Sequence, residues 1–398
     1  MSNEDFKSLT KREVEIYEKF FEWQKNSLTG LPGGDRYFKI IAARYTPEEA
    51  DLLTNIPFSP KNLKDLTDIK QMDPSELEKK LDECARKGMV YRFVRNGEVR
   101  YYLHDMVLSL RMWGAPGHSD DPEANPFAKL SYENIYYDSE MWVRPIEKGN
   151  RVIPINKTIE DPRTILPYEN MELLIDSKDY YCVGHCLCRE RKAAATGHRC
   201  EVVPLIQNCL HFDKLAHYMV ENGLAREITR EETKQILRNS MEQGLILTIE
   251  NTQQGQDTLC SCCGDCCVWI EALTKMRNSN AFSNSNYLAF GNSDTCTGCG
   301  LCIKRCQMKA IQFQDMPAVK GRVTVIKEEG GKERQLVNKT GKTVLVDVNR
   351  CVGCGICAYK CPTNSLTLKR KAVEHAPPRT VWDLAQHIMV ANAPAGDA

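Results

Sequence analysis

The chain has 398 residues, of which 42% are hydrophobic and 27% charged, a composition typical of globular domains rather than of disordered chains. Its 53 lysines and arginines balance 53 acidic residues, so no net charge draws it toward nucleic acid or a membrane surface. The amino terminus lacks a signal-peptide core, and no run of about 18 apolar residues predicts a transmembrane helix. We therefore expect a cytoplasmic protein with two to four domains.

Residues 1–110 are predicted to hold an initial helix, three further helices and a hairpin. A capping residue precedes a proline at 46–47, 59–60 and 73–74, which is the pattern of a helix start. Asn96-Gly97 lies between two β-type runs and predicts a hairpin turn. Three helices followed by a hairpin, over about residues 45–110, resemble a winged helix-turn-helix domain.

That resemblance implies that the third helix, within residues 73–88, would read DNA. Between residues 76 and 87 it carries four acidic and four basic residues, a poor match to a phosphate backbone, although the wing adds Arg92, Arg95 and Arg100. Because winged helices also serve as protein-docking modules, we favour docking over DNA binding. Cys84 lies alone within the third helix, where we expect it to be a packing residue.

Residues 111–180 begin with a stretch rich in proline, glycine and aspartate and are interpreted as a connector. Residues 372–398 are predicted to form a helix and a loose tail. Residues 181–290 are predicted to form a cysteine-rich α/β domain. Within it, helices are expected at 213–223 and after a Thr229/Glu232 capping box, and a strand at 245–251.

The cysteines are the unusual feature, because eighteen of the nineteen lie between Cys182 and Cys361. A long chain without an export signal is a poor setting for disulfides, and tight CxC, CxxC and CC spacings favour metal ligation. Two elements of the middle region, 186–189 (CxCR) and 260–267 (CxCCxxCC), resemble the cysteine-rich domain of larger ferredoxin-type proteins of anaerobes. The resemblance implies one or two further [4Fe-4S] clusters, with structural zinc as the alternative. The candidate ligands are Cys186, Cys188, Cys200, Cys209, Cys260, Cys262, Cys263, Cys266 and Cys267.

Residues 296–306 and 351–361 repeat the spacing C-x2-C-x2-C-x3-C. In the bacterial ferredoxin pattern the fourth cysteine of such a run binds the other cluster. Residues 291–371 accordingly resemble the two-[4Fe-4S] ferredoxin family. The resemblance implies one cluster bound by Cys296, Cys299, Cys302 and Cys361, and a second bound by Cys351, Cys354, Cys357 and Cys306.

The ferredoxin-like region departs from the family at two places. Gln307 stands where the family often has proline, which we expect to change local rigidity rather than ligation. Residues 307–350 form a long stretch between the motifs, with β-type runs and glycine turns that predict inserted hairpin strands. Basic residues exceed acidic ones by fourteen to six between 292 and 370, which either favours an acidic docking partner or balances cluster charge. The basic residues considered for docking are Lys304, Arg305, Lys309, Lys320 and Arg322.

The sequence contains no nucleotide-binding motif and no defensible catalytic triad, so no catalytic residue is predicted. We expect an iron-sulfur protein that relays single electrons to or from a redox partner in anaerobic metabolism. That partner would be an oxidoreductase subunit, a ferredoxin or a flavoprotein. One alternative is a redox-sensing winged-helix transcription regulator. Another is an enzyme whose middle cluster has an open iron site, so whether the chain is itself an enzyme is left open.

Overall fold

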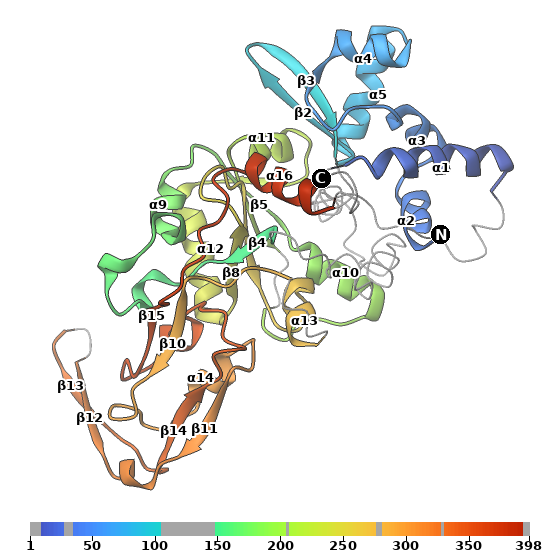
Figure 1. Ribbon diagram of the computed structural model, residues 1–398. Helices are drawn as coiled ribbons and strands as arrows, with labels where there is room; N and C mark the ends of the chain where they lie inside the picture. Colours follow the sequence, from blue (N-terminus) through green and yellow to red (C-terminus); the bar gives the residue numbers. More distant parts are fainter. Residues whose placement is uncertain are drawn as a thin grey trace. The chain divides into compact units, whose positions relative to one another are not determined.

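The computed structural model describes residues 9–27, 35–104, 148–203, 207–275, 281–327 and 330–392 (Figure 1). Helices and strands are mixed along these segments, which confirms the predicted mixed class. The chain divides into two compact units that do not follow chain order. Unit 1 comprises Met1–Glu147, Asp179–Thr229 and Ala385–Ala398, and unit 2 comprises Lys148–Lys178 and Arg230–Leu384. Residues 111–147 of the predicted connector and the end of the predicted tail lie outside the described residues.

Unit 1 begins with helices and a small antiparallel sheet of order β1-β3-β2. Its core packs α1, α3 and α5 against the sheet and buries Tyr17, Phe20 and Leu77. Cys84 is buried in the same core, which confirms its predicted packing role. The elements are α1 (Lys11–Gln24), α2 (Asp35–Arg44), α3 (Pro47–Leu53), β1 (Lys61–Asn62), α4 (Leu63–Lys70), α5 (Pro74–Arg86), β2 (Val90–Arg95) and β3 (Glu98–Leu103).

Two of the three predicted helix starts in unit 1 are confirmed. Thr46 and Asp73 cap α3 and α5, each followed by a proline in the first turn. The start predicted at 59–60 is wrong, because α4 begins only at Leu63. There the side-chain oxygen of Asn62 accepts a hydrogen bond from the backbone N–H of Asp65 at 2.8 Å. The two residues before α4 form strand β1, which pairs with β3 in the sheet.

The predicted hairpin turn between β2 and β3 is confirmed. Asn96 and Gly97 both have positive φ angles, 55° and 77°, as a tight turn between antiparallel strands requires. An asparagine tolerates this backbone and a glycine adopts it without strain. The turn therefore fixes the register in which Val94 faces Val99.

The rest of unit 1 is a second antiparallel sheet, of order β6-β5-β7, with two helices. Helix α11 packs on β2, and the hydroxyl of Tyr218 donates to the carbonyl oxygens of Ala85 and Val90, each at 2.9 Å. The N-terminal elements and this segment thus share one hydrophobic core. The elements are β5 (Tyr181–His185), α10 (Leu187–Thr196), β6 (Gln207–Phe212), α11 (Asp213–Glu221) and β7 (Arg226–Ile228).

His104 lies in this shared core against the rings of Tyr91, Tyr102 and Tyr218. Among the described residues, neither ring nitrogen has a hydrogen-bond partner. Burial, together with the charge of Arg44, lowers the pKa of His104 to about 3. The unfolded chain takes up a proton on this ring near pH 6.5, whereas the folded chain does so only near pH 3. The free energy of unfolding should therefore fall as the pH falls through this window.

Replacing His104 with phenylalanine tests that pH dependence. Between pH 7.5 and 5.5 the ring should cost the folded state about 1.4 kcal/mol, and His104→Phe should abolish this loss because phenylalanine cannot be protonated. The measurement is urea unfolding followed by fluorescence at pH 7.5 and 5.5. The exposed His387 provides the control His387→Gln, which should keep the wild-type slope. An unchanged slope in His104→Phe would show that this ring does not titrate with unfolding.

The first part of unit 2 is an antiparallel sheet of order β4-β8-β9 flanked by helices. The predicted helix at 230–244 is confirmed as α12, which ends before Gly244, and the predicted strand after it is confirmed as β8. The elements are β4 (Asn150–Val152), η3 (Asn156–Thr158), η4 (Pro162–Thr164), η5 (Pro167–Glu169), α9 (Met171–Asp176), α12 (Arg230–Gln243), β8 (Ile246–Glu250), β9 (Thr258–Cys262) and α13 (Val268–Thr274).

The second part of unit 2 contains the two cysteine motifs and three antiparallel strand pairs, β10 with β15, β11 with β14, and β12 with β13. The hairpin strands predicted between the motifs are confirmed as β12 and β13. The predicted C-terminal helix is confirmed as α16, of which the residues from Ala385 onward are assigned to unit 1. The elements are β10 (Tyr287–Gly291), α14 (Leu301–Arg305), β11 (Ile311–Asp315), η6 (Pro317–Val319), β12 (Val323–Lys327), β13 (Glu333–Val337), β14 (Lys342–Val346), α15 (Ile356–Tyr359), β15 (Leu366–Arg370) and α16 (Val381–Asn392).

The segment before α9 binds the second motif through its backbone. The N–H of Ile155 donates to the carbonyl oxygen of Cys354 at 3.1 Å, and the N–H of Glu160 donates to that of Leu368 at 2.9 Å. Residues 148–178 are therefore part of the frame around the cysteine motifs. None of the described helices combines the length and the apolar character of a membrane span.

Candidate metal centre

Four cysteines from two distant motifs line one cavity in unit 2. Cys296, Cys299 and Cys302 come from the first motif, and Cys361 comes from the second. Apolar side chains form much of the rest of the wall. These side chains are Leu301, Val344, Pro362 and Leu366.

The other four motif cysteines form a second, more deeply buried set. Burial raises the pKa of Cys357 well above the usual value for a thiol, and the neighbouring sulfurs of Cys354, Cys351 and Cys306 raise it further. Burial likewise raises the pKa of Cys354 to about 12, again with Cys351 and Cys306 as neighbours. The sulfur of Cys306 therefore lies close enough to the second motif to affect the pKa of its thiols. Without metal the thiols of Cys354 and Cys357 stay protonated, so metal binding must release their protons.

Two polar groups, one of them a backbone N–H donor, lie within hydrogen-bond distance of cysteine sulfurs of these sets. The N–H of Ala310 donates to Sγ of Cys306 at 3.2 Å, and Oγ of Ser365 lies 3.3 Å from Sγ of Cys361. Hydrogen bonds to ligand sulfurs stabilise the more negative, reduced state of a cluster. Each set therefore carries a means of tuning a redox potential.

Motif glycines allow the binding loops to lie against the rest of unit 2. Gly298 and Gly353 have φ angles of 66° and 71°, in the left-handed region that disfavours side chains. A Cβ at Gly353 would lie 2.2 Å from the carbonyl oxygen of Tyr287, and a Cβ at Gly298 would lie 2.8 Å from that of Lys342. A larger residue would push the cysteine loops away from their frame, so these positions fit the loop conformation that a cluster requires.

The segment around Cys306 is fixed to α12 and to the loop after β9. Arg305 donates to the carbonyl oxygens of Met241 and Glu242 at 2.7 and 2.9 Å. The side-chain oxygen of Gln307 accepts a hydrogen bond from the N–H of Gly264 at 2.9 Å. The residue that replaces the family's proline therefore makes a specific contact with the cysteine-rich loop.

The basic residues considered for docking are not equally available. Arg305 is engaged with α12, and Arg322 forms an ion pair with Asp294. Lys304, Lys309 and Lys320 are exposed.

In unit 1, the candidate ligands lie on α10, after it, and on β6. Cys186 is the residue before α10, and Cys188 lies in its first turn. Cys200 follows the helix and accepts a hydrogen bond from the N–H of Val203 at 3.4 Å. Cys209 lies on β6 opposite Gly184 of β5. Cys182, outside the candidate set, is buried on β5, and burial raises its pKa to about 12, which suits a packing role.

In unit 2, the stretch 260–267 divides between a strand, a loop and a helix start. Cys260 and Cys262 lie on β9, where Sγ of Cys262 is 3.4 Å from Oγ1 of Thr248. Cys267 is the residue before α13. None of the nineteen cysteines, all of which are described, forms a disulfide bond.

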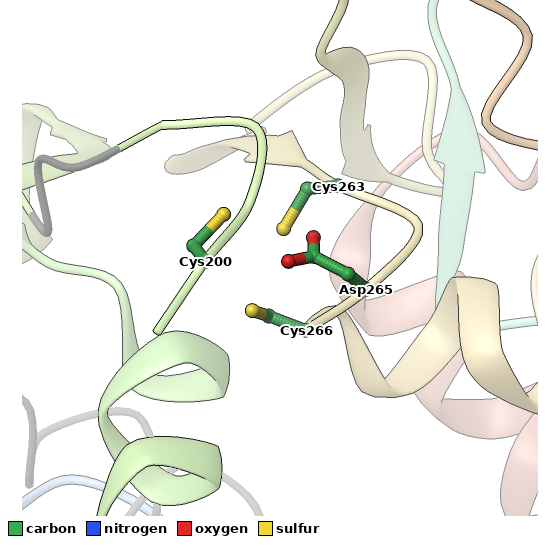
Figure 2. Close-up of side chains that lie close together, drawn as sticks. All are labelled: Cys200, Cys263, Asp265 and Cys266. Carbon is green, nitrogen blue, oxygen red and sulfur yellow. The ribbon is translucent and has the colours of Figure 1, made fainter. Parts of the chain in front are cut away.

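The loop between β9 and α13 brings three potential metal ligands together. The ligand atoms of Cys263, Asp265 and Cys266 lie within 4.8 Å of one another. Figure 2 shows the three side chains facing a common point; the fourth residue that it labels, Cys200, belongs to unit 1. Asp265 is not among the ligands predicted from the cysteine spacing. Its position between two adjacent cysteine pairs was the available signal.

Comparisons with known proteins support an iron-sulfur assignment for the C-terminal region. Residues 295–365 match the family described as "4Fe-4S dicluster domain". Over 83 residues the chain is 29% identical to "Putative ferredoxin-3" of Sinorhizobium fredii, covering 20% of this chain and 76% of that protein. No solved structure matches the chain. The C-terminal region is therefore a dicluster ferredoxin domain, and the protein is an iron-sulfur protein with at least two [4Fe-4S] clusters.

Proposed function

We propose that the protein relays single electrons through its [4Fe-4S] clusters to or from an oxidoreductase partner in anaerobic metabolism. The observation that carries the proposal is the cavity lined by four cysteines of both motifs, within the region that matches a dicluster domain. When bound, the clusters supply one-electron chemistry. The protein would hold them at fixed positions and donate a backbone hydrogen bond to the sulfur of Cys306.

The ligand pairing we propose is the crossed one that the resemblance implies. Cys296, Cys299, Cys302 and Cys361 would bind one cluster, in keeping with the cavity that they share. The other set is Cys351, Cys354, Cys357 and Cys306, in keeping with the effect of the Cys351 and Cys306 sulfurs on the pKa of Cys354 and Cys357.

We also propose that one or two further [4Fe-4S] clusters take their ligands from the pool of nine candidate cysteines of the middle region. Four of the nine lie in unit 1 and five in unit 2. Several of the nine lie at helix starts or at a strand end, where a side chain is held in a fixed direction. Structural zinc remains the alternative occupant of four thiolates.

Exposed lysines next to the ferredoxin motifs are the proposed contact for a redox partner. Lys304, Lys309 and Lys320 would attract an acidic face on an oxidoreductase subunit, a ferredoxin or a flavoprotein. Such contacts raise the rate of encounter more than the final affinity, which suits a transient electron-transfer complex.

The winged-helix-like elements of unit 1 are proposed to dock a protein rather than to read DNA. Basic side chains of α5 and the hairpin are paired with acids: Lys80 with Glu76, and Arg92 with Asp82. Arg100 is likewise paired, with Glu98 of the same strand. A phosphate backbone would have to displace these acids, which weakens the case for a transcription regulator.

Iron and sulfide counting, combined with an EPR redox titration after anaerobic purification, tests the proposed function. Two clusters require about eight irons and as many sulfides per chain, and one or two further clusters raise this to about twelve or sixteen. Reduction should produce one-electron EPR signals at low potential. A protein with about eight irons would refute the further clusters, and one without reversible EPR signals would refute electron transfer.

A further inference from the structure

The loop after β9 is built more tightly than the ferredoxin motifs. Its two thiols and one carboxylate, from Cys263, Asp265 and Cys266, place their ligand atoms within 4.8 Å of one another. Among the described residues, the eight motif cysteines form no group that meets this limit. The same chain thus contains two kinds of cysteine arrangement, one open and one compact.

The compact arrangement has the dimensions of a site for one metal ion. In a tetrahedral site with metal–sulfur bonds of about 2.3 Å, neighbouring ligand atoms lie about 3.8 Å apart. Thiolates of a [4Fe-4S] cluster bind different irons, so the cluster core separates their sulfurs. The open spacing of the motif cysteines suits a cluster, whereas the spacing of Cys263, Asp265 and Cys266 suits a single ion.

Two hydrogen bonds to backbone groups of the loop hold it in this shape, one made within the loop and one made by a residue outside it. Within it, the N–H of Cys267 donates to the carbonyl oxygen of Cys263 at 3.1 Å, which closes the turn. From outside, Gln307 accepts the N–H of Gly264, the residue between two of the ligands, at 2.9 Å. The amide of Gln307 also donates to the carbonyl oxygen of Gly244 at 3.2 Å, which orients it.

Gly264 makes this close approach possible. A Cβ on Gly264 would lie 2.8 Å from Oε1 of Gln307 and 3.1 Å from its carbonyl oxygen. A side chain there would push the loop away from Gln307 and spread its ligands. The glycine and the glutamine together therefore preorganise the three donors.

We propose that Cys263, Asp265 and Cys266 bind one divalent metal ion, zinc or ferrous iron, separate from the [4Fe-4S] clusters, and that Gln307 positions their loop. Two thiolates and a carboxylate are ligands that both ions accept. Binding converts the two thiols to thiolates and releases two protons to solvent, with no change of oxidation state. The assignment removes two cysteines from the nine candidates and leaves seven for a further cluster.

Metal analysis of the full-length protein tests the site. Zinc plus iron should exceed acid-labile sulfide by about one ion per chain, because [4Fe-4S] clusters contain iron and sulfide in equal amounts. The double variant Cys263→Ser/Cys266→Ser should lose this excess, and Asp265→Asn should reduce it. Asp315→Asn changes an exposed carboxylate on β11 and should retain it.

Two results would overturn the single-ion site. One is that the wild-type protein contains no excess of metal over sulfide, or that the double variant keeps this excess. The other is a loss of about four irons and four sulfides from the double variant, which would make these cysteines cluster ligands. The EPR signals of the ferredoxin clusters are recorded on the same samples. Their absence from wild-type protein would refute electron transfer without affecting the excess-metal count.

The role of Gln307 is tested by release of the ion to a chelator. Gln307→Ala should release the excess metal at about 10–100-fold lower chelator concentration, because the loop loses its outer support. Gln307→Glu keeps an oxygen that can accept the N–H of Gly264 and should restore much of the retention. Gln314→Ala, at an exposed position on β11, is the matched control. Equal retention by Gln307→Ala and wild type would show that Gln307 does not position the loop.

Discussion

Replacing Cys302 and Cys361 together is expected to remove about four irons per chain, no more than replacing Cys302 alone. The two residues are 59 positions apart in the sequence but line the same cavity. If they bind the same cluster, losing the second ligand costs nothing further once the first is gone. By the same argument, Cys357→Ser and Cys306→Ser should remove the other cluster, singly or together.

Combinations across the two sets provide the contrast. Cys302→Ser with Cys306→Ser changes two residues of the same motif, yet it should remove about eight irons, because each belongs to a different proposed cluster. Cys84→Ala, in the core of unit 1, should leave the iron count unchanged. Iron and sulfide analysis with EPR of anaerobic samples provides the readout. If the loss within a single motif is only about four irons, the ligands are not crossed.

Replacing Arg151 with alanine is expected to destabilise unit 2 by about 3–5 kcal/mol, because it leaves a buried carboxylate without its cation. Arg151 and Glu169 form an ion pair with side-chain exposures of only 1% and 0%. The same carboxylate accepts the N–H of Asn286 at 2.9 Å, and the guanidinium lies 5.0 Å from the centre of the Tyr168 ring. The pair therefore ties the frame segment 148–178 to the strand that leads into the first motif.

The measurement is the free energy of unfolding from anaerobic guanidinium titrations. Arg151→Met with Glu169→Leu removes both charges and should recover much of the loss, because apolar pairs often replace buried ion pairs at little cost. Arg163→Ala breaks the exposed pair with Asp161 and should have no measurable effect. A small loss in Arg151→Ala would mean that water reaches Glu169 once the guanidinium is removed.

Local features of the fold could be predicted from the sequence. The helix starts at Thr46 and Asp73 follow from a capping residue before a proline. The turn at Asn96-Gly97 follows from two residue types that tolerate the positive φ angles found there. The start of α4 could not be predicted, because a strand 38 residues away pairs with the residues before it. The shared core of unit 1 could not be predicted either, because Tyr218 and Ala85, which meet in it, are 133 residues apart in the sequence.

In the candidate site, too, some features could be predicted from the sequence and others could not. Cysteine spacing within a motif is a local property, so the ferredoxin region could be predicted from the sequence and was matched by comparison with known families. The role of Asp265 depends on how the turn after β9 directs three side chains, and that of Gln307 on a contact with Gly264 across 43 residues. Neither follows from residue type, because aspartate and glutamine are common on loops for reasons unrelated to metal binding.

The cavity lined by cysteines of both motifs also bears on how the protein is made. Cys296 and Cys361 lie 65 residues apart, so at about 5–20 residues per second a ribosome needs roughly 3–13 seconds to pass from one to the other. With the crossed pairing, neither cluster has all four ligands until the second motif has been made, and the first cluster lacks its fourth ligand until that interval is over. Iron loading then becomes a late event that acts on a nearly complete chain, and a product truncated before Cys361 would leave the first motif one ligand short.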